Sequence, residues 1–267
     1  MKRMIIVIIA FIICCILIAL SAALGAWWLT LIGTVAEIIL GCIFAVSFDY
    51  FLTKGNNIKL LFQSIKYYNK EIRLSFSYLF KIEVEGKYLL VKGNRIQSQF
   101  QPIGGVYKYY TEAKPTLESF EYRPDIRMGN EKETDDLRIV VKGKYLLKFV
   151  DWFLSMKDRE YDPYREFKEE LLDTKLIDPE LFPTLKYRKI LVHKSNIEFS
   201  TYLQCDELLY SDIFELNLNQ KQIEAIKKSV KDNPEKLCLA TDKELLSECY
   251  NGIEKNVGNN AKWLLGG

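Results

Sequence analysis

The feature that most constrains this chain is a long uncharged stretch close to its N-terminus. No charged residue stands between Met4 and Ala36. A straight helix over this stretch would be about 50 Å long, whereas the hydrocarbon core of a bilayer is about 30 Å thick. Two spans therefore fit better than one. We expect them at Met4–Ala23 and Trp27–Phe48, with a break at Leu24–Ala26.

The charges that flank this stretch predict its orientation. Lys2 and Arg3 precede the first span, and the second is followed by Lys54, Lys59, Lys66 and Lys70. Because the break between the spans is uncharged, the positive-inside rule places both termini in the cytosol. The alternative is a cleaved signal peptide, but its apolar core of about 7–15 residues would be shorter than the stretch seen here. Even after cleavage, the second span would remain as an anchor.

One carboxylate falls inside the second predicted span. Glu37 lies on the same helical face as several small residues, namely Thr30, Gly33, Thr34, Gly41 and Ala45. Small residues let helices approach closely in lipid, and a carboxylate at that depth is costly unless it is protonated or partnered. Two interpretations stay open. Glu37 is either hydrogen-bonded across the hairpin, to Ser21 or a thiol, or it forms an oligomer contact or a wet pathway.

Composition limits what the rest of the chain can be. We predict a transmembrane hairpin at 1–52, a linker at 53–70 with an amphipathic helix over Ile58–Tyr68, and a cytosolic domain at 71–267. The net charge of +2 gives no strong field that would attract a nucleic-acid polymer. The six cysteines show no disulfide or zinc spacing. His193 is the only histidine, and we interpret it as an ordinary strand residue.

The first half of the predicted domain reads as strands. Apolar and polar residues alternate over Ile72–Glu83, which is typical of a half-buried strand with Arg73 facing solvent. A second strand is expected at Lys87–Lys92. In Phe100–Tyr107, Gly104 and Gly105 follow a proline. They suit either a tight turn or close approach by a ligand.

The remaining elements are read from periodicity and from turn and cap residues. We predict a loop at Ala113–Asp136. Strands are expected at Leu137–Lys142, Thr184–Val192, Glu198–Gln204, Phe214–Leu218 and Leu237–Ala240. Helices are expected at Leu146–Met156, Asn219–Val230, Asp242–Cys249 (capped by Thr241) and Asn259–Leu265.

The segment Arg165–Leu172 (REFKEELL) carries three carboxylates at helical spacing. On a helix, Glu166, Glu169 and Glu170 share one face, where like charges repel unless a cation lies among them. Arg165 is one candidate cation, and Mg²⁺ or Mn²⁺ is another. The alternative is a solvated acidic face with no ligand.

Taken together, the Gly-Gly segment and REFKEELL resemble the Nudix family. In that family a loop and helix hold a divalent metal against a nucleoside diphosphate. The resemblance implies an α/β/α sandwich with a mixed sheet. It also implies that Arg165 orients the helix, that Glu166, Glu169 and Glu170 are metal ligands, and that Glu169 and Glu170 would be catalytic if the chain hydrolyses its ligand.

The chain departs from the Nudix motif at three positions. Lys157 stands where the motif has a glutamate, Asp151 where it begins with glycine, and Leu172 where it ends with glycine. The resemblance therefore implies the fold more firmly than it implies hydrolysis.

A closer resemblance extends over nearly the whole chain. The two apolar spans, followed by KYLLVKGNR, FQPIGGVYK and DREYDPYREFKEEL, resemble the membrane-anchored NUDIX effectors that accompany bacterial cGAS/DncV-like nucleotidyltransferases in CBASS anti-phage defence. This resemblance implies a bacterial inner-membrane protein that forms a homo-oligomer. Its domain would sense a cyclic nucleotide, and its helices would disrupt the bilayer.

From the resemblance we expect the ligand near Gly104, Gly105, Tyr107 and Arg165. Tyr107, Tyr109 and Tyr110 are candidates to stack on bases, and Arg165 is a candidate to meet a phosphate. Two alternatives remain at this stage. One is a membrane-tethered Mg²⁺-dependent Nudix hydrolase of a nucleoside diphosphate derivative. The other is a scaffold whose acidic helix docks a partner protein.

Overall fold

The structure is a computed structural model that describes residues 12–16, 18–19, 33–35, 37–41, 58–93, 99–127 and 135–266. The chain divides into two compact units, Met1–Phe62 and Gln63–Gly267. In the first unit the residues described up to Gly41 are helical, and Glu37 is exposed. No helix among the described residues is long and apolar enough to cross a bilayer. Most of the two predicted spans lies outside the described residues, so the hairpin stays a prediction.

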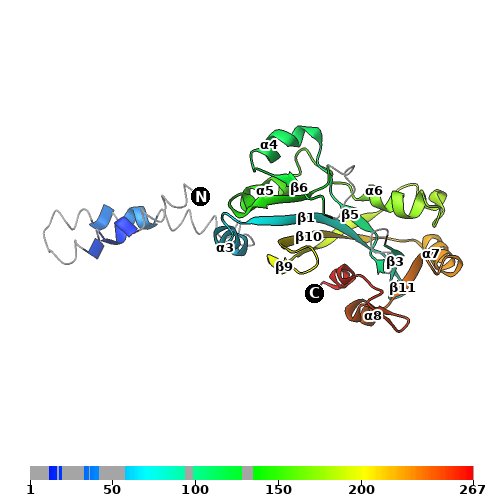
Figure 1. The fold of residues 1–267 in the computed structure, drawn as a ribbon. Helices are drawn as coiled ribbons and strands as arrows, with labels where there is room; N and C mark the ends of the chain where they lie inside the picture. The colour runs from blue at the N-terminus through cyan, green and yellow to red at the C-terminus, as the bar shows by residue number, and fades with distance from the viewer. Residues whose placement is uncertain are drawn as a thin grey trace. The chain divides into compact units, whose positions relative to one another are not determined.

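The second unit is built on a large mixed sheet (Figure 1). Its path runs β6-β7-β1-β10-β8, with β5 also paired to β1 and β9 to β10. β1 and β10 lie parallel at the centre, in a register that pairs Arg73 with Glu207 and Lys81 with Glu215. The strands are β1 (Glu71–Lys81), β5 (Gly104–Val106), β6 (Arg123–Pro124), β7 (Arg138–Lys142), β8 (Tyr187–Lys194), β9 (Glu198–Ser200) and β10 (Cys205–Leu216).

Helices cover one face of this sheet through aromatic contacts. Phe76 on β1 packs edge-on against Phe149 of α5 (Leu146–Leu154), with ring centroids 5.0 Å apart. Further along β1, Phe80 meets Phe167 of α6 (Tyr164–Phe167) at 5.7 Å. Figure 1 shows α5 and α6 on the same side of β1. This face therefore positions the REFKEELL segment over the end of the central strand.

A second, smaller sheet covers the opposite face. It contains β2 (Glu83–Val84), β3 (Lys87–Lys92), β4 (Phe100–Gln101) and β11 (Leu237–Ala240). Leu79 and Ile213 of the large sheet share a buried cluster with Leu90 of β3, Leu245 of α8 (Asp242–Ser247) and Leu264 of η6 (Asn259–Leu265). The α/β fold with a mixed sheet agrees with the predicted fold class, within the part of the chain that the structure describes.

The remaining elements connect these layers. They are α3 (Ile58–Lys66), η2 (Thr111–Ala113), α4 (Lys114–Glu118), η3 (Gly143–Tyr145), η4 (Lys168–Leu172, a π-helical turn), η5 (Pro179–Leu181), α7 (Gln220–Asp232), β12 (Cys249–Tyr250) and β13 (Ile253–Glu254). The predicted cap is confirmed, because the Thr241 side chain accepts from Glu244 N in a capping box.

Several predicted elements differ from the structure. The segment predicted as a loop at Ala113–Asp136 contains α4 and β6. The strand predicted at Glu198–Gln204 ends at Ser200, and the one predicted at Phe214–Leu218 is the end of the long β10. Arg73, which was expected to face solvent, is buried. Its guanidinium is bound by Asp125 next to β6 and by Glu207 on β10, so protein rather than solvent surrounds this position.

Candidate functional site

The REFKEELL segment is held in place by its apolar residues. Phe167 is fully buried and packs against Phe80 of β1 and, at 5.5 Å, Phe182. After Phe167 the helix widens into a π turn, in which Asp173 N donates to Lys168 O. Leu171 and Leu172 in this turn are both buried. The sequence predicted one continuous helix here. The π turn replaces its second half, and such turns are frequent at functional sites.

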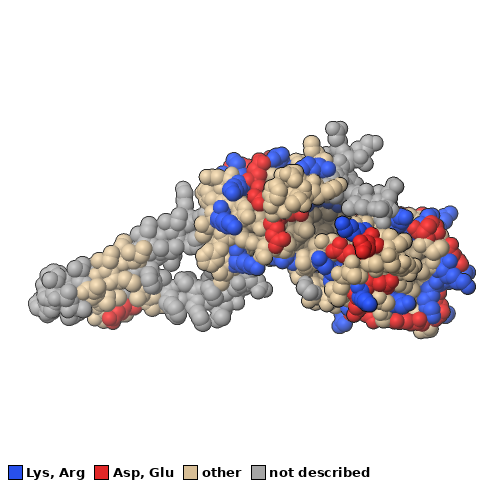
Figure 2. Space-filling model, turned by 60° about the horizontal axis from the view of Figure 1, so that its bottom comes forward, with Lys and Arg blue, Asp and Glu red and all other residues tan. Residues whose placement is uncertain are grey.

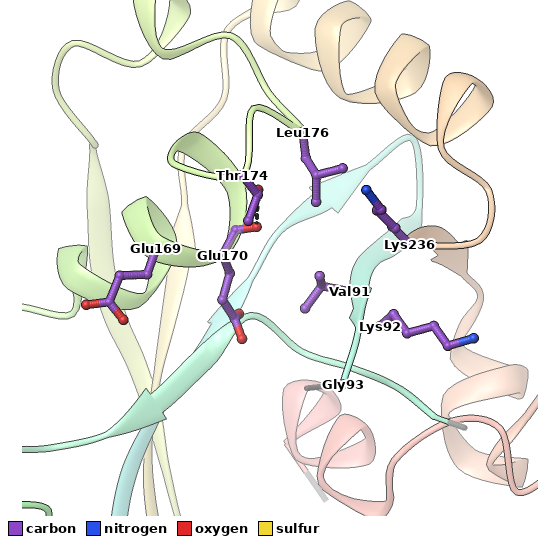
Figure 3. Close-up of a pocket in the computed structure, with 8 residues that line it drawn as sticks. All are labelled: Val91, Lys92, Gly93, Glu169, Glu170, Thr174, Leu176 and Lys236. Atoms are coloured by element: carbon purple, nitrogen blue, oxygen red, sulfur yellow. Dashed lines mark hydrogen bonds between the residues drawn. The ribbon is translucent and has the colours of Figure 1, made fainter. Parts of the chain in front are cut away.

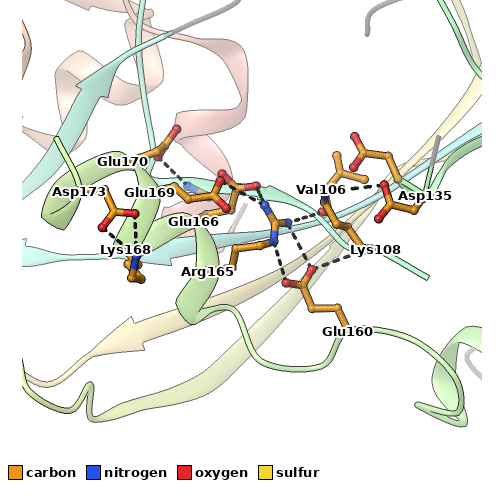
Figure 4. A network of polar contacts seen from close by, with 12 residues as sticks. Val106, Lys108, Asp135, Glu160, Arg165, Glu166, Lys168, Glu169, Glu170 and Asp173 are labelled. Atoms are coloured by element: carbon orange, nitrogen blue, oxygen red, sulfur yellow. Dashed lines mark hydrogen bonds and ion pairs between the residues drawn. The ribbon is translucent and has the colours of Figure 1, made fainter. Parts of the chain in front are cut away.

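Arg165 is the centre of a network of charges beneath this helix (Figure 4). Its guanidinium donates to Glu160 Oε1 at 2.9 Å, to Glu166 Oε1 at 2.6 Å and to the backbone carbonyl of Val106 at 3.1 Å. A longer contact of 3.4 Å reaches Glu169. Burial acts to lower the pKa of Arg165, but its hydrogen bond to Glu160 and the nearby Tyr78 and Glu166 raise the pKa overall. Arg165 therefore supplies the cation that the three-glutamate face requires.

The Gly-Gly segment lies directly against this helix. Gly104 N donates to Glu170 Oε2 at 3.3 Å. A Cβ added at Gly105 would collide with the Glu166 carboxylate, and one added at Gly104 would collide with the carbonyl of Tyr78. The close approach that the two glycines predict is therefore made by the chain itself, as they form β5 beside β1.

Two of the three glutamates resist ionisation. Burial raises the pKa of Glu170 to about 8, Glu166 adds repulsion, and the hydrogen bond from Gly104 lowers it in part. Burial also raises the pKa of Glu166, against the opposing attraction of Arg165. Glu169 is the exposed member of the set. The three carboxylates thus lie in three different environments on one short segment.

A cavity of about 360 Å³ opens beside this helix (Figure 3). It is lined by Val91, Lys92, Gly93, Glu169, Glu170, Thr174, Leu176 and Lys236. Its walls come from β3, the π turn and the connection between α7 and β11, which brings together segments far apart in the sequence. The Lys236 side chain extends toward Leu176, whereas the Lys92 ammonium points away and lies 5.8 Å from the Phe100 ring centroid. The cavity thus combines apolar surface with carboxylates and with the lysine Lys236, which is exposed at its edge.

The structure brings together only some of the residues predicted from sequence. Glu169 and Glu170 line the cavity, whereas Gly104, Gly105 and Arg165 lie behind the helix. Tyr107 is fully buried, and its hydroxyl donates to Asp212 at 2.8 Å. The structure therefore does not place the Tyr107 ring where a base would stack. Tyr109 is also buried. Tyr110 is exposed, but it does not line the cavity.

The structure brings two of the three predicted metal ligands, Glu169 and Glu170, to the cavity. Among the described residues, no group of three or more His, Cys, Asp or Glu side chains is placed to hold a metal ion. Only Glu169 and Glu170 face the cavity, and Glu166 is bound to Arg165. Mg²⁺ at phosphate-binding sites is commonly held by one or two carboxylates together with water and the phosphates of the ligand. Metal binding by Glu166, Glu169 and Glu170 stays a prediction.

Sequence reasoning missed three residues of this region. Glu160 binds Arg165 and also accepts from Lys108 N at 3.2 Å, although the motif predicted a glutamate at the position of Lys157. Lys92, in the KYLLVKGNR segment, and Lys236, directly before β11, line the cavity but were not singled out as site residues. The sequence did offer a signal for Glu160, because it is a glutamate that stands shortly before Arg165 and close to the motif position occupied by Lys157. For Lys236 the sequence offered no such signal.

Comparison with known proteins assigns the domain. Residues 71–265 match the family described as SMODS-associated NUDIX domain, a match that covers most of the chain. No curated protein matches the chain. The matched residues include the central sheet, the REFKEELL segment and the cavity-lining residues described above. The chain therefore belongs to the SMODS-associated NUDIX domain family.

Proposed function

We propose that this protein is a membrane-anchored CBASS-type effector whose NUDIX domain binds a cyclic nucleotide made during phage infection. The observation that carries the proposal is the cavity beside the REFKEELL segment. Its volume of about 360 Å³ falls in the range of small-molecule sites. Val91 and Leu176 offer apolar surface to a base, and Lys236 offers a cation to a phosphate. Membership of the SMODS-associated family supports the link to a nucleotide signal.

The anchor in this proposal is the uncharged stretch from Met4 to Ala36 and the apolar residues after it, in a bacterial inner membrane with both termini cytosolic. Ligand binding would change how these segments associate in a homo-oligomer and so disrupt the bilayer. This requires that the ligand bind the rearranged state more tightly. Moving an equilibrium from 1:99 to 99:1 takes about 5.5 kcal/mol of differential affinity.

Calorimetry of the full chain against a panel of cyclic di- and trinucleotides tests the proposal. We expect one of them to bind, and Lys236→Ala to weaken that binding about tenfold, equivalent to about 1.4 kcal/mol. Lys228→Ala is the matched control, because Lys228 is an exposed lysine of α7 that does not line the cavity. Equal affinity in both variants would exclude this cavity as the site, and no binding at all would overturn the sensor.

The alternative is a membrane-tethered hydrolase of a nucleoside diphosphate derivative. It is favoured by one observation, that Glu169 and Glu170 both line the cavity. If it holds, Glu169→Gln and Glu170→Gln abolish turnover while both variants remain folded. If the purified chain releases no product from any nucleoside diphosphate derivative in a broad panel with Mg²⁺, the alternative fails and the sensor stands.

A further inference from the structure

Two lysines stand directly opposite each other at the edge of the cavity. β3 and β11 pair in antiparallel register, with Val91 opposite Leu237. The pairing continues one residue further, because Lys92 N donates to Lys236 O at 2.8 Å. Directly opposite residues of an antiparallel pair point to the same face of the sheet, with Cβ atoms about 4.5–5.5 Å apart. Both lysines are exposed, and both line the cavity.

Like charges in this arrangement repel each other and destabilise the pair of strands. The acidic residues close to the two lysines do not relieve this repulsion. Glu169 and Glu170 line the same cavity, and Glu235 adjoins the pair in the sequence. Among the residues that the structure describes, none of these three carboxylates forms an ion pair with Lys92 or Lys236.

The side chains of the two lysines diverge (Figure 3). Lys236 extends toward Leu176, whereas Lys92 turns away from the cavity and places its ammonium 5.8 Å from the Phe100 ring centroid. Phe100 lies opposite Lys92 on the other side of β3, in β4. A cation–π contact at an exposed site is weak, and a lysine stem is flexible. Both ammonium groups are therefore able to turn toward an anion between them.

Two other surface lysines of the domain show the usual arrangement, in which a carboxylate lies beside the ammonium group. Lys227 lies 2.8 Å from Glu85, and Lys168 lies 2.7 Å from Asp173. On the face drawn in Figure 2, basic and acidic side chains are interspersed. A like-charged pair without such a partner favours an anion supplied from outside. Phosphate fits this requirement, because lysine is a common phosphate ligand and a tetrahedral phosphate offers a separate oxygen to each ammonium group.

We propose that Lys92 and Lys236 form a clamp for one phosphate group of a ligand whose remaining part enters the cavity. The phosphate chemistry rests on the lysine pair, whereas the identity of the ligand as a cyclic nucleotide rests on the proposed function. Binding draws Lys92 from the Phe100 ring toward the anion. Repulsion between two ammonium groups is then replaced by the attraction of both to one shared charge. A chain that lacks one of these lysines should therefore be more stable and bind less well.

Thermal unfolding of the full chain in a neutral detergent tests the repulsion. Lys92→Gln and Lys236→Gln should each raise the unfolding temperature by about 1–3 °C at low salt, because either substitution removes one of two opposing like charges. The rise should disappear near 1 M salt, where the Debye length is about 3 Å. Lys228→Gln is the matched control, because Lys228 is an exposed lysine of α7 outside the cavity. A lower unfolding temperature, or a rise that salt does not change, would overturn the proposal.

Amine-reactive labelling followed by mass spectrometry tests the clamp itself. The unaltered chain is labelled alone, with inorganic phosphate, and with each member of the panel of cyclic di- and trinucleotides. We expect a phosphate-bearing ligand in excess to slow the labelling of Lys92 and Lys236 about threefold or more and to leave Lys228 unchanged. In Lys236→Gln the protection of Lys92 should be lost, because one ammonium group alone does not hold the anion. Protection of only one lysine, or of neither, would overturn the clamp.

The clamp and the cyclic-nucleotide sensor fail in different ways. If inorganic phosphate protects both lysines but no cyclic nucleotide does, the sensor fails and the clamp stands. If calorimetry shows a cyclic nucleotide binding Lys92→Gln as tightly as the unaltered chain, the clamp fails and the sensor stands. An affinity about tenfold lower in Lys92→Gln and unchanged in Lys228→Gln supports both.

Discussion

Arg73 is held in a buried position by partners that are distant in the sequence. It stands on the central strand β1 with 4% of its surface exposed. Its guanidinium reaches Asp125 at 2.5 Å and Glu207 at 2.9 Å. Asp125 is in turn bound by Arg127 at 2.6 Å. Burial opposes ionisation of Asp125, but the hydrogen bonds from Arg127 and Arg73 lower its pKa overall.

Arg73→Met should therefore be strongly destabilising. Removing one member of a buried ion pair costs about 3–5 kcal/mol when the remaining charge is left without a partner. Asp125 keeps Arg127, so we expect a cost toward the lower end of this range. The control is Arg123→Met, whose ion pair with Glu71 is exposed and should contribute less than about 1 kcal/mol. Urea unfolding of both variants gives the comparison. Similar costs for the two would show that burial does not set the strength of the Arg73 network.

A neighbouring side chain, rather than an unusual backbone conformation, explains why a glycine stands at position 105. A methyl group there would meet the Glu166 carboxylate, so Gly105→Ala must displace Glu166 from Arg165. We expect a cost of about 1–3 kcal/mol, the usual range for added volume in a packed site. In a Glu166→Ala background the same substitution should cost clearly less. A double-mutant cycle by chemical unfolding measures the difference, and additive costs would contradict this steric explanation.

At the scale of elements, the α6 helix and the π turn after it carry a pH dependence. Glu170 has a pKa near 4.5 when unfolded and about 8 in the folded chain. Between these values the folded chain keeps a proton that the unfolded chain has released. Unfolding is therefore favoured as the pH rises through this interval. The stabilisation is fully present below about pH 4.5 and is lost as the pH passes about 8.

Glu170→Gln should remove this dependence, since glutamine does not titrate. Thermal unfolding of both proteins between about pH 5 and pH 8 should show the unaltered chain losing stability relative to the variant. Glu169→Gln is the control, because Glu169 is the exposed carboxylate of the same turn. A parallel pH profile for the Glu170→Gln and unaltered proteins would show that Glu170 is already ionised in the folded chain.

At the scale of the whole molecule, ligand binding should stabilise the NUDIX domain. A ligand at one hundred times its dissociation constant adds about 2.7 kcal/mol to the stability of the state that binds it. We expect the cyclic nucleotide that binds to raise the unfolding temperature of the unaltered chain and of Lys228→Ala. The rise should be smaller for Lys236→Ala at the same concentration. An equal rise in all three proteins would place the ligand outside the cavity.

Local patterns predicted most of the elements that depend on near neighbours. The strand predicted after Ile72, the KYLLVK strand and the Thr241 cap agree with the structure. β10 was recognised only at its end, because Asp206, Glu207, Ser211 and Asp212 interrupt its apolar pattern. Those polar residues are tolerated in a central strand because some meet distant partners, as Asp212 meets Tyr107 and Lys189.

The sequence by itself determined the family, the strand–helix framework and the identity of the glutamate-bearing helix. Those depend on spacing along the chain, which hydrophobic periodicity and motif positions record directly. Only the tertiary structure decided which groups those glutamates meet. Gly104 and Gly105 contact Glu170 and Glu166 from about 60 residues earlier in the chain, and Lys236 lines the same cavity as Glu170 from about 66 residues later. No local pattern encodes contacts over such separations. The cavity forms where β3, the π turn and the connection between α7 and β11 come together.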